Sequence, residues 1–172
     1  GFMGKTLGYP SDFVEAINAA APMHDIGKIG VSGAILLKPG PLNQDEYEKV
    51  KQHTLIGGKI LSGSFNPVIQ MAEKIACNHH ENWDGTGYPN GLSGEDIPVE
   101  ARIVAVVDVY DALMSDRIYR KGLPEEEVLE FIKSQSGIKF DPKICSTFFE
   151  NIDEVRKICE KSDDMVSVLK ML

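Results

Sequence analysis

The chain has 172 residues, 42% of them apolar, and a formal net charge of −8 at pH 7. This length suits one domain with one hydrophobic core, and the negative charge argues against binding a nucleic-acid polymer. With no secretory signal, no apolar run of the roughly 20 residues that span a membrane, and three cysteines without a CxxC pair, we expect a cytoplasmic protein with reduced thiols and no membrane partner.

The first part of the chain predicts a helix followed by a loop. Ser11 is placed to cap a helix over residues 12–23, and Pro22 is expected to bend it near its end. Residues 27–41 are rich in glycine and proline, which predicts a loop.

The middle of the chain predicts two helices and a long loop. Asn43 begins a capping-box pattern with Glu46, so we expect a helix that ends near residue 61. A second helix is expected over residues 67–78. Residues 84–98 carry several glycines and prolines, and a loop of this length inside a compact domain is usually functional.

Proline signals begin each of the later helices. Pro98 precedes a helix over residues 99–114, and Pro124 and Pro142 each begin another, the last one capped by Asp141. No strand alternation is present. The pattern predicts an all-α fold, a bundle of about six to eight helices with a long Gly/Pro-rich loop.

Three of the four histidines are followed by another metal-ligand residue type, in the pairs His24-Asp25, His79-His80 and His80-Glu81. Neighbours on a helix point about 100° apart, so such a pair would straddle two ions more readily than chelate one. Two pairs that face each other would suit a dinuclear site. Each motif alone is also typical of a surface pair or a helix end.

Two further residues extend this candidate ligand set. His53 by itself is typical of a hydrogen-bonded helix residue. Asp108 lies in a helix that is apolar on nearly every side, so its carboxylate needs a cation, either an arginine such as Arg102 or Arg117, or a metal. Imidazole with carboxylate suits iron, manganese or zinc, and without thiolates we favour iron or manganese over zinc.

Two motifs carry a resemblance to a known family. The segments from His24 to Lys28 and from His79 through Gly87-Tyr88-Pro89 resemble the HD-GYP domain, a branch of the HD metal-dependent phosphohydrolases. The likeness runs from about Ala19 to Phe149. It implies an HD-like bundle that hydrolyses cyclic-di-GMP to linear pGpG and, in some members, to GMP. We expect this domain over residues 1–150, with a C-terminal helical extension over residues 151–172.

The resemblance also implies roles for individual residues. Asp25 would bridge two transition-metal ions, and a hydroxide between the ions would attack phosphorus, with Asp25 and Lys28 as catalytic residues. The implied metal ligands are His24, Asp25, His53, His79, His80 and Asp108. The implied substrate contacts are Lys28, Tyr88, Arg117 and Arg120. Supporting hydrogen bonds or loop closure are expected from Glu81, Asp84 and Asp111.

One departure from the family pattern concerns a third metal position. The family places an additional histidine on a helix well before the HD pair, whereas only 23 residues precede His24 here, none of them histidine. We therefore expect the chain to be N-terminally incomplete relative to the family, and we do not expect a third ion.

Family members are often fused to receiver or sensor domains, so a regulatory domain is expected upstream of this one. Apolar positions within residues 155–172 would suit either a homodimer contact or packing on the chain's own core.

Two alternatives to a cyclic-di-GMP phosphodiesterase stay open. Metal ligands do not specify a base, so the substrate could be another cyclic dinucleotide or nucleotide. The chain could also be a signalling or binding module that keeps the fold with weak or no catalysis. The intact ligand set favours an enzyme.

Overall fold

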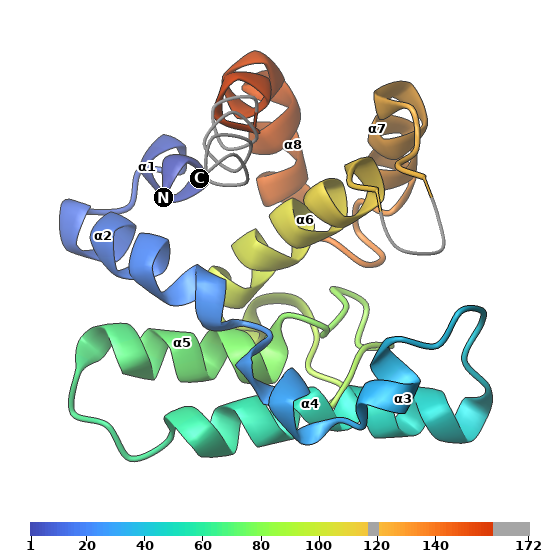
Figure 1. Cartoon of the computed structure of the whole chain (residues 1–172). Coiled ribbons are helices and arrows are strands. Elements are labelled where there is room, and N and C mark those ends of the chain that lie inside the picture. The colour runs from blue at the N-terminus through green and yellow to red at the C-terminus, as the bar shows by residue number, and fades with distance from the viewer. Residues whose placement is uncertain (117–120, 160–172) are drawn as a thin grey trace, which may run out of the picture.

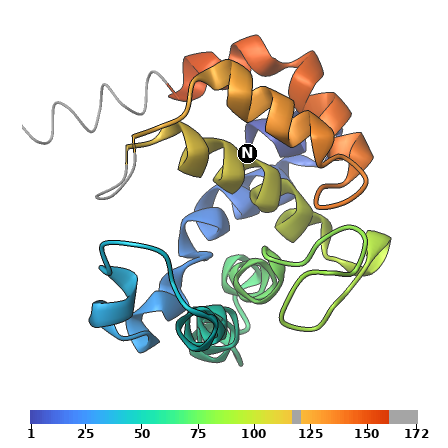
Figure 2. The ribbon, with the colours of Figure 1, turned by 90° about the vertical axis from the view of Figure 1, so that its right-hand side faces the viewer.

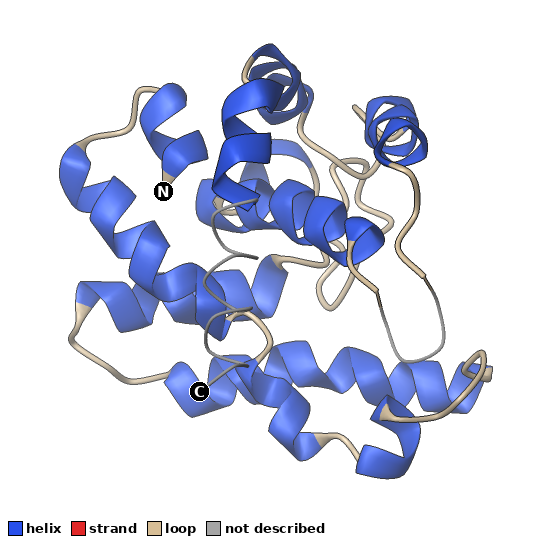
Figure 3. Ribbon diagram, turned by 45° about the horizontal axis from the view of Figure 1, so that its top comes forward, coloured by secondary structure: helices blue, strands red, loops and turns tan. Residues whose placement is uncertain are grey.

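The computed structural model describes residues 1–116 and 121–159, and these residues form an all-helical domain (Figures 1 and 3). An isolated bridge between Ser136 and Phe140 is the only β-type pairing within those ranges. The predicted all-α fold is confirmed. The elements are α1 (Phe2–Thr6), α2 (Ser11–Ala20), η1 (Ala21–Met23), η2 (Ile26–Gly30), α3 (Gly33–Leu36), α4 (Gln44–Leu61), α5 (Pro67–Asn78), η3 (Gly94–Asp96), α6 (Val99–Met114), α7 (Glu125–Ser134) and α8 (Pro142–Glu150), followed by a helical segment at 152–159.

Local capping signals fix several of these helices where the sequence predicts them. The Asn43 side chain accepts a hydrogen bond from the Glu46 amide while the Glu46 carboxylate accepts one from the Asn43 amide, so the capping box of α4 is confirmed. Helix α5 spans the predicted residues, with Pro67 in its first turn. The Asp141 side chain caps α8 as predicted.

Two predictions near the N-terminus are wrong. Ser11 lies inside α2, Pro10 is the N-cap, and the helix ends at Ala20, because Pro22 cannot continue the hydrogen-bond ladder and the chain turns through η1. Residues 27–41 are not all loop, since they contain most of η2 and the whole of α3.

The packing of η2 on α4 explains why the glycine and proline content of residues 27–41 led to a wrong loop prediction. A Cβ on Gly27 would lie 1.9 Å from the His53 carbonyl oxygen and 2.4 Å from the Gly57 nitrogen. Only glycine lets the two backbones come this close. Gly27 therefore serves close helix packing, and a count of glycines and prolines wrongly assigns it to a loop.

The helices form two layers (Figure 1). Helices α4 and α5 run side by side below, and α6 crosses above them, as the view along α4 and α5 in Figure 2 also shows. Helices α1 and α2 flank one end of α6, and α7 and α8 cover its upper side. The core cluster includes the fully buried residues Ile75 on α5, Val106 on α6 and Phe148 on α8.

The long loop after the two adjacent histidines is confirmed, with η3 as a single turn inside it. The buried Glu81 carboxylate accepts hydrogen bonds from the amides of Asn90 at 2.7 Å and Leu92 at 3.1 Å. A Cβ on Gly87 would lie 2.2 Å from the Asn82 nitrogen, so this glycine lets the loop close on its own start. The loop is therefore folded against the helix that delivers the histidines.

The end of the chain is described only to residue 159. Val155 belongs to the core, and Arg156 pairs with Glu125 on α7 at 2.8 Å, so this part packs on the bundle. The predicted extension beyond residue 159 lies outside the described residues.

Within the described ranges, none of the helices has the length and apolar character required to cross a membrane.

Candidate metal centre

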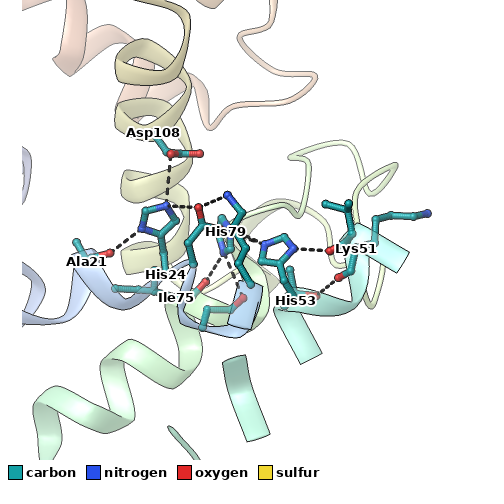
Figure 4. Close-up of polar contacts among 12 residues, drawn as sticks. Ala21, His24, Lys51, His53, Ile75, His79 and Asp108 are labelled. Carbon is teal, nitrogen blue, oxygen red and sulfur yellow. Dashed lines mark hydrogen bonds and ion pairs between the residues drawn. The ribbon is translucent and has the colours of Figure 1, made fainter. Parts of the chain in front are cut away.

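The fold brings all six predicted ligands together at the junction of the two layers. His24 and Asp25 lie between η1 and η2, His53 lies on α4, and His79 and His80 follow the last turn of α5. Asp108 projects from α6 above them, toward His24 (Figure 4). Residues more than 80 positions apart in sequence thus meet at one point.

Backbone carbonyl groups orient three of the imidazoles. The Nδ1–H group donates to Ala21 O at 2.9 Å in His24, to Val50 O at 2.6 Å in His53, and to Ile75 O at 3.0 Å in His79 (Figure 4). A carbonyl oxygen only accepts, so Nδ1 carries the proton and Nε2 points toward Asp25 with its lone pair available whenever the ring is neutral. Metal-binding histidines are typically held in this way.

Asp25 joins two groups of ligands through its two oxygens. Its Oδ1 lies 3.3 Å from His53 Nε2 and 3.8 Å from His79 Nε2, and one ligand atom each of Asp25, His53, His79 and His80 lies within 4.8 Å of the others. We call this group the histidine half. The Oδ1 atom is buried and accepts no hydrogen bond from the described residues.

The other group, the carboxylate half, consists of Asp25 Oδ2, His24 and Asp108. His24 Nε2 lies 3.3 Å from Asp25 Oδ2 and 3.4 Å from Asp108 Oδ1. Lys28 also forms an ion pair with Asp25 Oδ2, from one turn further along η2. This half borders a cavity of about 620 Å³, lined largely by apolar residues of α1, α2, α6 and 152–159.

The two halves differ in protonation. Burial would lower the pKa of His24, but its contacts with Asp108 and Asp25 raise it to about 10, so His24 is cationic at neutral pH. Burial and the charge of His24 lower the pKa of His79 to about 4, and burial also lowers the pKa of His53 and, to about 2, that of His80. The histidine half is therefore neutral apart from Asp25.

Two details of the predicted ligand set need correction. His79 and His80 do not diverge, since both offer nitrogens to the histidine half, because α5 ends at Asn78 and helical spacing no longer applies. Asp108 is not fully buried, with 29% of its side chain exposed, and Arg102 does not serve it, because Arg102 pairs with Asp141 at 2.6 Å.

Of the predicted substrate contacts, Lys28 and Tyr88 lie at the centre. The Tyr88 ring stacks on His80 with ring centroids 4.8 Å apart, and burial raises its pKa above the usual value. Arg117 and Arg120 lie outside the described residues. Trp83 faces Arg102 and lines a separate cavity of about 420 Å³, so it packs away from the ligands.

The three predicted supporting residues behave differently. Glu81 holds the loop closed over the histidine half, through its bonds to Asn90 and Leu92. Asp84 accepts hydrogen bonds from Thr86 inside its own exposed turn and does not reach the ligands. Asp111 lines the cavity that also contains His24 and Asp108.

Sequence reasoning missed several residues beside the centre. Tyr47 and Lys51 on α4 lie next to Tyr88, with the Lys51 ammonium 5.5 Å from the Tyr88 ring centroid. Lys139, from the connection between α7 and α8, lies close enough to interact electrostatically with His80 and Asp108. The only local signal for Lys139 was its position directly before the Phe140-Asp141-Pro142 segment.

Comparison with known proteins identifies the family of the chain. A family model described as HD domain matches residues 1–144. A cyclic di-GMP phosphodiesterase of Thermotoga maritima is 44% identical over 164 residues, which cover 95% of this chain and 45% of that protein. The cyclic di-GMP phosphodiesterase response regulator RpfG of Xanthomonas campestris is 45% identical over 159 residues, or 92% of this chain and 42% of that protein.

A solved structure shares the fold. The crystal structure of a cyclic GMP-AMP specific phosphodiesterase from Vibrio cholerae superimposes with a TM-score of 0.65 at 19% sequence identity, over 90% of this chain and 42% of that one. The chain thus spans less than half the length of the relatives it matches. By its matched family model, its HD and GYP segments and its helical fold, the chain belongs to the HD-domain family of metal-dependent phosphohydrolases, in the HD-GYP branch.

Proposed function

We propose that this chain is a metal-dependent phosphodiesterase that hydrolyses cyclic-di-GMP to linear pGpG, with His24, Asp25, His53, His79, His80 and Asp108 as ligands of two transition-metal ions. The observation that carries the proposal is the position of Asp25, whose two oxygens face two separate sets of donors. A carboxylate so placed is suited to bridge two ions. The names of the relatives support the choice of substrate.

The residues present fit such ions. The buried Asp25 Oδ1 lacks a hydrogen-bond donor among the described residues, which is costly for a carboxylate oxygen unless a cation lies against it. His53 and His79 have the proton on Nδ1 and are neutral, which is the form that binds metal. The nitrogen and oxygen donors, with no thiolate in the set, favour iron or manganese over zinc.

In the carboxylate half, the protein's own cations balance the charge. Protonated His24 lies between the two aspartates, and Lys28 pairs with Asp25. A metal ion at this position would compete with the His24 proton and with the Lys28 ammonium. Lys28, once released from Asp25, would be close to any anion held at the centre, and its charge would then stabilise a phosphate group.

When bound, two ions would supply a strong nucleophile from water near neutral pH and would neutralise charge on the phosphoryl group. The chain itself performs the remaining tasks. Asp25 holds the two halves together, and Lys28 stabilises the negative charge that builds up on phosphorus oxygens. Glu81 keeps the loop closed, so the Tyr88 ring stays stacked on His80 and limits access of bulk water to that ligand.

A base of the substrate would find aromatic side chains beside the metals. The Tyr47 and Tyr88 rings lie 6.4 Å apart, nearly perpendicular, with Lys51 over both. A purine is able to stack on such a surface without strong selection between guanine and adenine. Another cyclic dinucleotide is therefore the second candidate substrate.

We also propose a regulatory domain in the whole protein, as the name of the Xanthomonas relative indicates for that protein.

The experiment is a turnover assay on anaerobically purified chain loaded with ferrous iron or manganese. Cyclic-di-GMP should yield linear pGpG, and Asp25→Asn should abolish turnover. Asp45→Asn, an exposed carboxylate in the first turn of α4, serves as the matched control and should retain full activity. Binding of cyclic-di-GMP without turnover by the metal-loaded chain would instead favour a signalling module, and exclusive turnover of cyclic GMP-AMP would change the substrate.

A further inference from the structure

Lys139 is a half-buried cation outside both sequence motifs, and it interacts electrostatically with His80 and Asp108 of the candidate centre. Its ammonium lies 3.4 Å from Asn82 Oδ1, two residues after His80. None of the carboxylates in the described ranges lies within 4.0 Å of it, and the acidic group that attracts it is Asp108, at longer range.

Three other lysines of the described residues are each paired with a carboxylate. Lys28 is bound to Asp25, Lys38 lies 2.6 Å from Glu46, and Lys51 lies 2.7 Å from Glu48. Burial of an ammonium without a carboxylate partner is unfavourable, and it lowers the pKa of Lys139. Such a cation beside a candidate metal centre is suited to receive an anionic ligand.

The backbone around Lys139 is firmly placed. Its carbonyl oxygen accepts a hydrogen bond from the Trp83 amide at 3.1 Å, and its own amide donates to Gln135 O at 3.0 Å. The next residue, Phe140, is only 1% exposed. The side chain therefore extends from a fixed point, and its charge interacts with both His80 and Asp108.

Lys139 and Lys28 approach the centre from different segments. Lys28 comes from η2 on the Asp25 Oδ2 side, whereas Lys139 comes from the α7–α8 connection on the side of His80 and Asp108. A phosphate group held at the centre would thus be within reach of two ammonium groups. Lysine is well suited to this task because it acts as a point charge with several donors.

We propose that Lys139 contacts a non-bridging phosphate oxygen of the substrate and contributes to its binding. This inference rests on the proposed function, because the phosphodiester is the anion concerned. It adds to the catalytic machinery a residue that lies outside the HD and GYP segments. The alternative is a structural role, in which Lys139 only ties the loop through Asn82.

The test compares Lys139→Met, Lys139→Arg and the control Lys133→Met, an exposed lysine on α7. Inorganic phosphate is titrated into each manganese-loaded chain by calorimetry, and KM and kcat are measured with cyclic-di-GMP. Loss of the charge-assisted contact should weaken phosphate binding about ten-fold in Lys139→Met and raise KM more than it lowers kcat. Lys139→Arg should recover most of the affinity, while Lys133→Met and the metal content should stay unchanged.

A second variant separates contact from tethering. Asn82→Ala removes the hydrogen bond to Lys139 but keeps the ammonium, so phosphate affinity should stay close to that of the unmodified chain. The proposal is overturned if Asn82→Ala reproduces the loss, if Lys139→Met binds phosphate normally, or if the unmodified metal-loaded chain binds no phosphate. Lys139-dependent phosphate binding without cyclic dinucleotide hydrolysis would refute the proposed function and leave the Lys139 assignment standing.

Discussion

The two halves of the metal centre share Asp25 and differ in burial and in charge. In the histidine half, the rings of His53 and His79 are buried, neutral and fixed by backbone carbonyls one turn earlier. In the carboxylate half, His24 is cationic and lies with Asp108 at the edge of a cavity of about 620 Å³.

The comparison shows that the histidine half is defined by the orientation of its donors, and the carboxylate half by its balance of charges. The histidine half is preformed, since backbone carbonyls already orient the imidazoles of His53 and His79 toward Asp25. The carboxylate half is balanced by the protein's own cations, so an ion must displace a proton and an ammonium to enter. We therefore expect the histidine half to bind metal more tightly, and the carboxylate half to be filled second.

The largest effect should come from the residue that the halves share. Asp25→Asn removes the charge that faces both sets of donors and should lower turnover by at least about 1,000-fold, because several kcal/mol of transition-state stabilisation depend on the ions. Single-turnover kinetics with excess enzyme measure the residual rate. A loss of less than about ten-fold would contradict a bridging role for Asp25.

The next prediction concerns the packing that carries the histidine half. Gly27→Ala places a methyl group against the His53 carbonyl. Because the backbone has to move to make room for it, the free energy of unfolding should fall by about 3 kcal/mol. The control is Gly33→Ala in α3, where a Cβ meets nothing within 4 Å. Urea unfolding of both variants gives the comparison, and equal stabilities would show that η2 is free to shift on α4.

Asp108→Asn should affect only the carboxylate half. It keeps the shape but removes one of the two negative charges around His24, so metal affinity in that half should fall by roughly 100-fold, with the histidine half unchanged. Manganese titration followed by calorimetry resolves the two events. A uniform weakening of both would show that the halves do not act separately.

The smallest predicted effect on metal affinity comes from Tyr88, whose ring stacks on His80 of the histidine half. Tyr88→Leu loses the ring that stacks on His80, an interaction of about 1 kcal/mol, so manganese affinity of that half should fall about five-fold. Tyr88→Phe keeps the ring and should stay within about two-fold of the unmodified chain. If both variants weaken binding equally, the hydroxyl and not the stacked ring is responsible.

The sequence predicted what local chemistry determines. The Asn43–Glu46 capping box and the Asp141 cap depend on residues within one turn, and they appear as expected. The short helices η2 and α3 were not predicted, because the glycine content of residues 27–41 resembles that of a loop. In the fold, Gly27 is instead required by contact with the backbone of His53, far along the chain.

The candidate site followed a similar division. The six candidate ligands could be predicted because the HD and GYP motifs resemble a known family, and His53 in particular depended mainly on that resemblance. The split into two halves was not predictable, since it depends on α5 ending before His79 and on Asp108 facing His24 across the layers. Lys139 was not predicted either, because its only local signal was its position before the Phe140-Asp141-Pro142 segment and its role depends on tertiary placement.

The number of metal ions held by each variant tests most directly whether Asp25 joins two metal subsites. Each anaerobically loaded chain is freed of loose metal by gel filtration and analysed for iron or manganese. We expect about two ions in the unmodified chain, about one in Asp108→Asn, and few or none in Asp25→Asn. A single ion in the unmodified chain, or an undiminished content in Asp25→Asn, would contradict the shared-carboxylate centre.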